Sequence, residues 1–161
     1  MILLFRGQTR RKGEMVNMKG EPVPSNWVYG GVFKPNDDTA FAIIYSYADC
    51  QKYAVYNDTV GMFSGVKDVK VNNVFEGDIV KCKWNRVGIV KYGVYNQDGS
   101  GGEYSPTKCI GWYIHFLGDN WYNSAGQDES ILSVRYGFQG KEEDREFEVI
   151  GNIYDNPEMI K

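Results

Sequence analysis

The amino-acid sequence predicts a mainly β protein, on three features of its 161 residues. Short runs rich in valine, isoleucine and aromatic residues alternate with turn clusters, at intervals typical of all-β folds. No segment has the long 3.6-residue periodicity of an amphipathic helix. The composition is 42% hydrophobic and 15% aromatic with 19 glycines, which suits a turn-rich globular chain better than a disordered one.

Eight strands follow from this alternation. They are expected at residues 2–7, 27–33, 41–47, 78–84, 88–95, 109–117, 131–138 and 146–154. Four turn-rich segments separate them, at residues 18–26, 34–38, 96–107 and 118–130. Near the C-terminus, Asn156 before Pro157 predicts a short closing helical turn, because asparagine caps helices and proline favours the first helical position.

The strand expected at residues 109–117 indicates which side chains form a core, because successive strand side chains point to opposite faces. The predicted core face carries Ile110, Trp112, Ile114 and Phe116. We expect Trp112 and Phe116 to be buried. His115 falls on the other face, where we expect it to be largely exposed.

The strand expected at residues 78–84 shows the same alternation. Val80, Cys82 and Trp84 share one face, which we interpret as the inward one. Lys81 and Lys83 lie on the other face, where their ammonium groups stay hydrated.

Net charge, apolar runs and cysteine content indicate which binding partners and which cellular compartment to expect. A net charge of −3 with a pI of about 5.2 gives no global attraction to nucleic acid or anionic lipid. The apolar run at residues 2–5 is too short for a signal peptide or a membrane span. Three cysteines without a close pair, Cys50, Cys82 and Cys109, favour small core residues in a reducing cytoplasm over a disulfide framework. We expect a cytoplasmic protein without a membrane partner.

Catalytic chemistry finds little support in the residue pattern. The single histidine, His115, lies about 20 Å from Cys109 along one strand, too far for a nucleophile and base pair. Approach of another cysteine such as Cys50 stays open. The histidine and cysteines lack metal-binding spacing, and the glycine-rich segment 96–107 lacks the Gly-Lys-Ser/Thr ending of a phosphate loop. The acidic run at 142–148 reads as a solvated strand edge. We therefore predict no catalytic residue, no metal site, no cofactor and no enzymatic activity.

Basic and aromatic residues are interleaved in the segment 79–96, which has no acidic residue. The candidate nucleic-acid-binding residues in it are Lys81, Lys83, Arg86, Lys91 and Tyr92. Small barrels bind nucleic acid by combining cations that follow the backbone with aromatic rings that stack on bases. The alternative interpretation is that the lysines keep an exposed hairpin soluble and protect its edge.

Six segments carry a resemblance to a known family. They are FRG (5–7), WVYG (27–30), TVGMFSGVKD (59–68), VFEGDIVK (74–81), GIVKYG (88–93) and FEVIGNIYDNPEMI (147–160). In this order they resemble the YopX family of phage and prophage proteins, and the last segment is the most specific. Residues 69–73 depart from the pattern, because they lack the Asn-Gly turn usual after the lysine-aspartate pair.

The resemblance implies an N-terminal β-rich portion over residues 1–70 and a C-terminal SH3-like barrel over residues 71–161. It also implies a phage or prophage origin, and self-association in the cytoplasm of a bacterial host. No catalytic residue, cofactor or substrate is established for the family, so none is carried over to this chain.

We expect a protein-interaction or assembly module of unassigned biochemical activity. The chain holds 12 tyrosines, 4 tryptophans and 8 phenylalanines, more than a core of this length needs, and aromatic residues enrich interface centres. The expected partners are a second copy of the chain and an unidentified phage or host protein. The alternative is a nucleic-acid-binding accessory protein that uses the basic segment.

Overall fold

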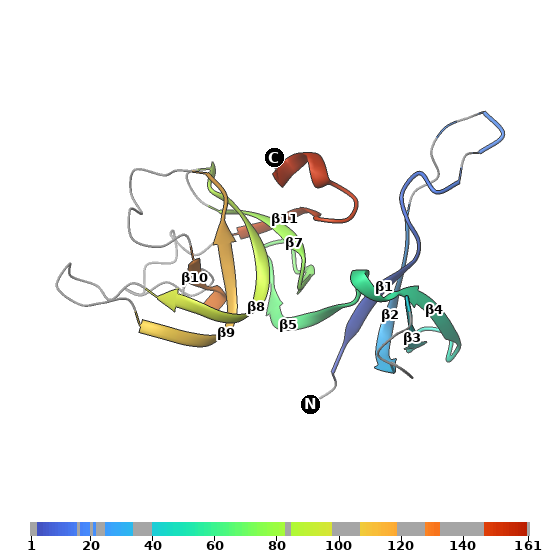
Figure 1. The fold of residues 1–161 in the computed structure, drawn as a ribbon, viewed down its shortest axis with the longest axis horizontal. Coiled ribbons are helices and arrows are strands. Elements are labelled where there is room, and N and C mark those ends of the chain that lie inside the picture. The colour runs from blue at the N-terminus through green and yellow to red at the C-terminus, as the bar shows by residue number, and fades with distance from the viewer. Residues whose placement is uncertain are drawn as a thin grey trace. The chain divides into compact units, whose positions relative to one another are not determined.

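The structure is a computed structural model that describes residues 3–15, 17–19, 21, 25–33, 40–82, 85–97, 107–118, 128–132 and 147–160. It is mainly β, as predicted, and the strand pairs among these residues are antiparallel (Figure 1). The chain divides into two compact units, Met1–Phe63 and Ser64–Lys161. The resemblance placed the corresponding boundary between residues 70 and 71.

The first unit is built on four consecutive strands. They are β1 (Phe5–Arg10), β2 (Asn26–Phe33), β3 (Phe41–Ser46) and β4 (Lys52–Tyr56), followed by the 3₁₀ turn η1 (Asn57–Thr59). Neighbours in sequence are neighbours in the sheet, and β1 also pairs with the start of β5 (Gly61–Lys67). The first three strands were predicted, whereas β4 and β5 were not.

The sheet of the first unit is rolled, so that β1 and β4 meet although two strands lie between them in the ladder. A Cβ added at Gly7 of β1 would lie 2.8 Å from Val55 Cγ2 of β4, so the close approach requires glycine. Val28, Ala42 and Ile44 fill the inside of the roll together with Val55, and each is at most 8% exposed. Small aliphatic side chains suit this narrow interior.

The second unit contains the rest of β5 and a five-stranded sheet. After β6 (Asn73–Phe75), its strands are β7 (Asp78–Cys82), β8 (Val87–Gln97), β9 (Thr107–Phe116), β10 (Asp128–Ser130) and β11 (Phe147–Asn152). Their order in the sheet is β10-β9-β8-β7-β11. The ladders between described strands close neither sheet into a barrel, so the predicted SH3-like barrel is not confirmed.

The core of the second unit lies on one face of this sheet. Val80, Val90 and Ile114 are fully buried there, and Phe116 is 2% exposed, which confirms its predicted burial. Trp112 is only half-buried and packs against this core. Cys82 is buried among these residues, as predicted.

Ile110 corrects the predicted core face, because it is 76% exposed. β7 pairs with β8 only between Val87 and Ile89, and β10 pairs with β9 only between Tyr113 and His115. Beyond these positions β8 and β9 pair only with each other in the described part of the chain, as a curved two-stranded ribbon (Figure 1). Ile110 lies in the ribbon, on the same face as the core but beyond the strands that cover it.

The C-terminal segment of the second unit explains why its residue order is specific. The predicted helical turn is confirmed as the 3₁₀ turn η4 (Pro157–Ile160). Asn152 Oδ1 accepts hydrogen bonds from the backbone N–H groups of Tyr154 and Asp155 at 3.0 and 2.9 Å. Asn156 folds back on β11, where a Cβ at Gly151 would lie 2.5 Å from its Oδ1. Glycine at 151 therefore permits the return of the chain.

The turn between β5 and β6 is closed by a buried carboxylate. Asp68 is 2% exposed, and its Oδ1 accepts hydrogen bonds from the N–H groups of Lys70 and Asn72 at 2.9 and 2.8 Å. Val71 takes a left-handed conformation with φ of 68°, which usually favours glycine or asparagine. The carboxylate thus holds a turn that lacks the Asn-Gly pair.

Candidate functional site

The structure describes the side chains of four of the five predicted nucleic-acid-binding residues. Lys81 pairs with Val87 across the β7–β8 ladder, and Lys91 lies four positions after Val87, so the two lysines share one face of the sheet. Tyr92 lies on the opposite face, where its ring contacts Trp112. Lys83 lies outside the residues whose side chains the structure describes.

Arg86 is engaged within the second unit. Its guanidinium forms an ion pair with Glu129 at 2.6 Å and lies 3.6 Å from the ring centroid of Phe116. The Arg86 side chain is only 19% exposed, so an approaching phosphate must compete with a carboxylate already in place. The structure thus places the four described candidates in three different settings.

This placement predicts weak binding of nucleic acid. We expect no saturable binding of single-stranded or duplex oligonucleotides below about 10 µM at about 50 mM salt, since nonspecific binding rests on several cations acting together. Fluorescence anisotropy measures this. Binding that tightens at low salt, and that is lost when Lys81, Lys83, Arg86 and Lys91 are all changed to glutamine, would contradict the prediction and restore the nucleic-acid function.

The structure also describes the histidine and the cysteines that were weighed as catalytic residues. His115 Nδ1 lies 2.7 Å from Asp128 Oδ1, and the imidazole is 35% exposed, half-buried where we predicted a largely exposed side chain. Burial raises the pKa of the Cys82 thiol to about 12, which keeps it protonated and poorly nucleophilic at neutral pH. Cys50 is exposed, unlike the core residue that we predicted.

Neither a metal-binding cluster nor a membrane-spanning helix is found among the described residues. No group of three or more histidine, cysteine, aspartate or glutamate side chains gathers there to hold a metal ion. Among the helices of this part of the chain, none has the length and apolar character needed to cross a bilayer.

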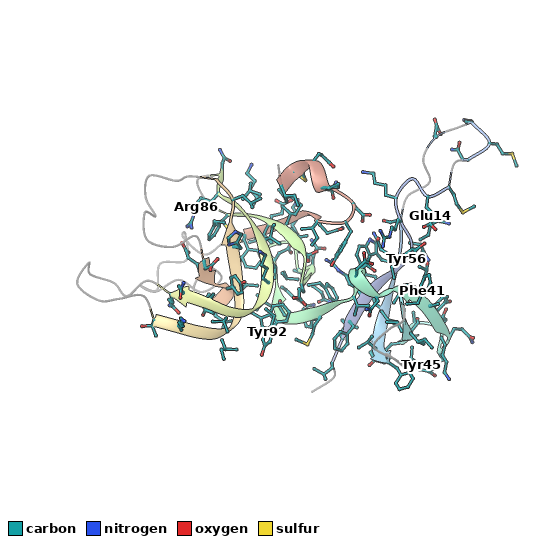
Figure 2. The ribbon with its side chains drawn as sticks, in the orientation of Figure 1. Glu14, Phe41, Tyr45, Tyr56, Arg86 and Tyr92 are labelled. Atoms are coloured by element: carbon teal, nitrogen blue, oxygen red, sulfur yellow. The ribbon has the colours of Figure 1, made fainter. Side chains whose placement is uncertain are left out.

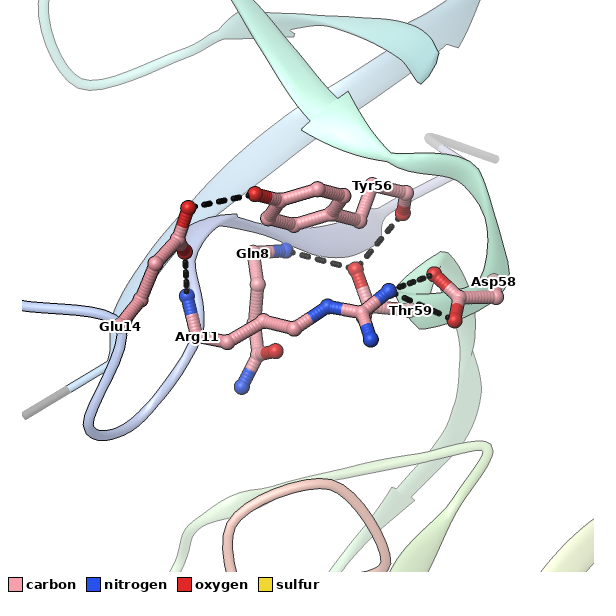
Figure 3. Close-up of polar contacts among 6 residues, drawn as sticks. All are labelled: Gln8, Arg11, Glu14, Tyr56, Asp58 and Thr59. Carbon is pink, nitrogen blue, oxygen red and sulfur yellow. Dashed lines mark hydrogen bonds and ion pairs between the residues drawn. The ribbon is translucent and has the colours of Figure 1, made fainter. Parts of the chain in front are cut away.

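A polar cluster holds the connection after β1 onto the end of β4 (Figure 3). Arg11 makes a two-pronged ion pair with Asp58, at 2.9 and 2.8 Å, and lies over the Tyr56 ring at 4.4 Å. The Tyr56 hydroxyl donates to Glu14 at 2.7 Å. This hydrogen bond lowers the pKa of Glu14 and raises that of Tyr56. Because the carboxylate stays ionised and the phenol stays protonated, this hydrogen bond is better suited to holding the two segments together than to acid–base catalysis.

Exposed aromatic side chains gather on the outside of the roll in the described part of the first unit. These residues, which we call the outer aromatic face, are Tyr29 and Phe33 of β2, Phe41 and Tyr45 of β3, Tyr47 after β3, and Tyr56 of β4. Five of them are between 43% and 65% exposed, and Tyr56 is half-buried. Exposed aromatic groups of this density mark interaction sites in soluble proteins.

Register brings these rings together across three strands. Phe41 lies opposite Tyr56 in the β3–β4 ladder, with ring centroids 5.2 Å apart, and Figure 2 shows Tyr45 farther along the same strand. Phe33 lies opposite Ile43. Odd-numbered residues of β2 and β3 thus point outward, while their even-numbered neighbours fill the roll.

Gly31, in the middle of the face, leaves room for the Tyr47 ring to pass over β2. A Cβ at Gly31 would lie 3.0 Å from the Tyr47 hydroxyl oxygen, and that hydroxyl donates to the carbonyl of Leu3 at 3.3 Å. The Tyr47 ring therefore spans from β3 to the start of β1. The excess of aromatic residues is visible in the sequence, but its concentration on this face is not.

Two comparisons with known proteins complete the description. A family profile described as YopX protein matches residues 4–161 of the chain, nearly its full length. A comparison with curated proteins finds no match.

Proposed function

We propose that this chain, which belongs to the YopX family, is a non-enzymatic protein-interaction module that assembles with copies of itself through the outer aromatic face. The exposure of that face carries the proposal. Tyrosine and phenylalanine suit such a role, because they supply large contact areas while losing little side-chain entropy on binding.

A second copy of the chain is the partner that the chemistry of the face fits best. The six rings carry no charge, and the Arg11 guanidinium that lies over the Tyr56 ring is paired with Asp58, so two copies of the face meet with little like-charge repulsion. Lys52, opposite Tyr45 in the ladder, is at the margin. A two-fold axis uses the same patch twice, and β4, at the edge of the sheet, can pair with its copy to satisfy its backbone groups.

The expected strength follows from area. Aromatic side chains bury roughly 150–250 Å² each when fully covered, so five rings that are about half exposed supply roughly 500 Å². A standard interface buries about 800 Å² per partner. The proposed assembly is therefore a reversible one, with a dissociation constant on the order of 10 µM.

The test is the mass of the protein in solution. We expect light scattering after size exclusion to give 18.4 kDa at about 1 µM and a mass approaching twice that value at about 200 µM. The double variant Phe33→Ser, Phe41→Ser should stay monomeric at both concentrations. Both side chains are exposed, so the fold should be retained.

The matched control is Val94→Ser, Ile110→Ser, which removes two exposed apolar side chains from the second unit. This control should associate like the original protein. A monomer at every concentration would remove self-association, and dissociation caused by the control alone would move the contact to the β8–β9 ribbon.

The finer expectations from the resemblance belong to the same proposal. A phage or host protein as further partner, a phage origin and a cytoplasmic location fit an interaction module. An SH3-like closure of residues 71–161 would require pairing beyond the ladders of the described strands.

A further inference from the structure

We infer that the first unit binds a cationic group, an alkylammonium or a guanidinium, in a cavity beside β2. The cavity measures about 250 Å³, ample for a lysine or arginine side chain. The residues that line it include Trp27, Tyr29, Asp49 and Tyr53. The inference shares Tyr29 with the outer aromatic face but needs only one copy of the chain, because all of these residues belong to one unit.

The cavity forms where β3 turns away from β2. The β2–β3 ladder begins at Gly30 opposite Ser46, so residues 26–29 of β2 have the turn after β3 beside them in place of a paired strand. Ala48 and Asp49 of this turn complete the wall. The recess therefore lies at the end of β3, between β2 and the turn that follows β3.

Asp49 is held in place as an anion. The Tyr53 hydroxyl donates to its Oδ2 at 2.5 Å, and the Gln51 N–H donates to its Oδ1 at 3.2 Å. These donors stabilise the carboxylate, and the hydrogen bond from Tyr53 is the main reason that the pKa of Asp49 is lowered. The carboxylate is therefore ionised at neutral pH.

The charge of Asp49 is not neutralised within the described part of the chain. Asp58, Glu129 and Glu148 each form an ion pair with a lysine or arginine. Asp49 has hydrogen-bond donors only, and no described lysine, arginine or histidine lies within ion-pair distance of it. A fixed negative charge in an aromatic-walled recess attracts cations both by charge and through the ring faces.

One neighbouring charge limits the site. The Arg6 guanidinium lies over the Trp27 ring at 4.7 Å from its centroid, so that ring already serves one cation. The bound group must then lie on the Asp49 side, near Tyr53, whose hydroxyl contacts that carboxylate. Exposed ion pairs are weak, so we expect a dissociation constant on the order of 10 mM for an isolated side-chain analogue.

The experiment is an NMR titration of the protein with three probes. Butylamine represents a free amine, Nα-acetyl-lysine amide represents a side chain within a peptide, and Nα-acetyl-norleucine amide is the uncharged control. We expect saturable shifts of the Trp27 indole N–H and the Ala48 and Asp49 amides with both cations. Tighter binding of the lysine probe would assign the site to a peptide, and tighter binding of butylamine to a free amine. Equal shifts with the norleucine probe would overturn the inference.

Variants separate the site from the rest of the unit. Asp49→Asn should weaken cation binding about five-fold, while Asp58→Asn, which removes an equally exposed carboxylate paired with Arg11, should leave it unchanged. Tyr29→Leu should also weaken binding, and serves if Asp49→Asn fails to fold. Unchanged binding in both site variants would overturn the inference.

The titration is also run on the monomeric variant Phe33→Ser, Phe41→Ser. Cation binding there supports the cavity whether or not the protein self-associates. Loss of cation binding together with retained folding would show instead that the probes bind only at a contact between copies, against the inference.

Discussion

Replacing Gly30 with alanine should destabilise the first unit by at least about 3 kcal/mol, beyond the usual range for overpacking. The added Cβ would lie 1.8 Å from the Tyr45 carbonyl oxygen and 2.7 Å from its carbon. These atoms belong to the backbone of the neighbouring strand and cannot rotate aside. β2 and β3 must therefore separate, which breaks the ladder that supports the outer aromatic face. Hydrogen exchange of the β2 and β3 amides measures the loss.

Gly31→Ala is the matched control, one position along the same strand. Its Cβ would meet the Tyr47 hydroxyl oxygen at 3.0 Å, at the far end of a side chain that can swing outward. We expect a cost of no more than about 1 kcal/mol. Equal protection of the amides in the two variants would reject the close approach of the strands at Gly30.

Ile114→Ala should cost about 2–5 kcal/mol, because it leaves a cavity in the core of the second unit. Ile114 is 0% exposed and packs in the cluster with Val80 and Val90. Ile110→Ala makes the same chemical change on the same face of the same strand, but its side chain is 76% exposed. That variant should stay within about 0.5 kcal/mol of the original protein.

Denaturant unfolding followed by circular dichroism compares the two isoleucine variants. The transition of the second unit should move to a lower midpoint only for Ile114→Ala. A comparable shift for Ile110→Ala would mean that the β8–β9 ribbon is covered in solution, and would favour it as the contact between copies.

The comparison of Ile110 with Ile114 also shows how far alternation predicts a core. Alternation correctly assigned both residues to one face of β9, because side-chain direction is a local property of a strand. Burial also depends on which strands lie alongside, and their pairing ends before Ile110. The strand β5 was missed for a related reason. Its first residue, Gly61, and Gly65 lower its local strand propensity, and its pairing with β1 supports it instead.

In the sequence, the outer aromatic face corresponds to aromatic residues at alternate positions of two strands. Tyr29 and Phe33 alternate with Val28 and Val32 in β2, and β3 repeats the arrangement. The odd-numbered and the even-numbered residues of these strands are both largely hydrophobic, so composition could not decide which set faces inward. The roll decides it, since the close approach at Gly7 leaves room for valine and alanine inside. The Asp49 cavity carries no comparable signal, because its walls come from separate strands and a turn.

The buried Asp68 makes the turn between β5 and β6 depend on β11. Besides its own turn, the carboxylate accepts a hydrogen bond from the Val149 N–H at 3.1 Å, across 81 positions of sequence. Until β11 is in place, this charge lacks one of its donors and the N–H of Val149 lacks its acceptor. Contacts of such long sequence separation slow folding, because the loop must close before the contact forms. During synthesis, the β5–β6 turn therefore waits for β11 to leave the ribosome before all the hydrogen bonds of its carboxylate can form.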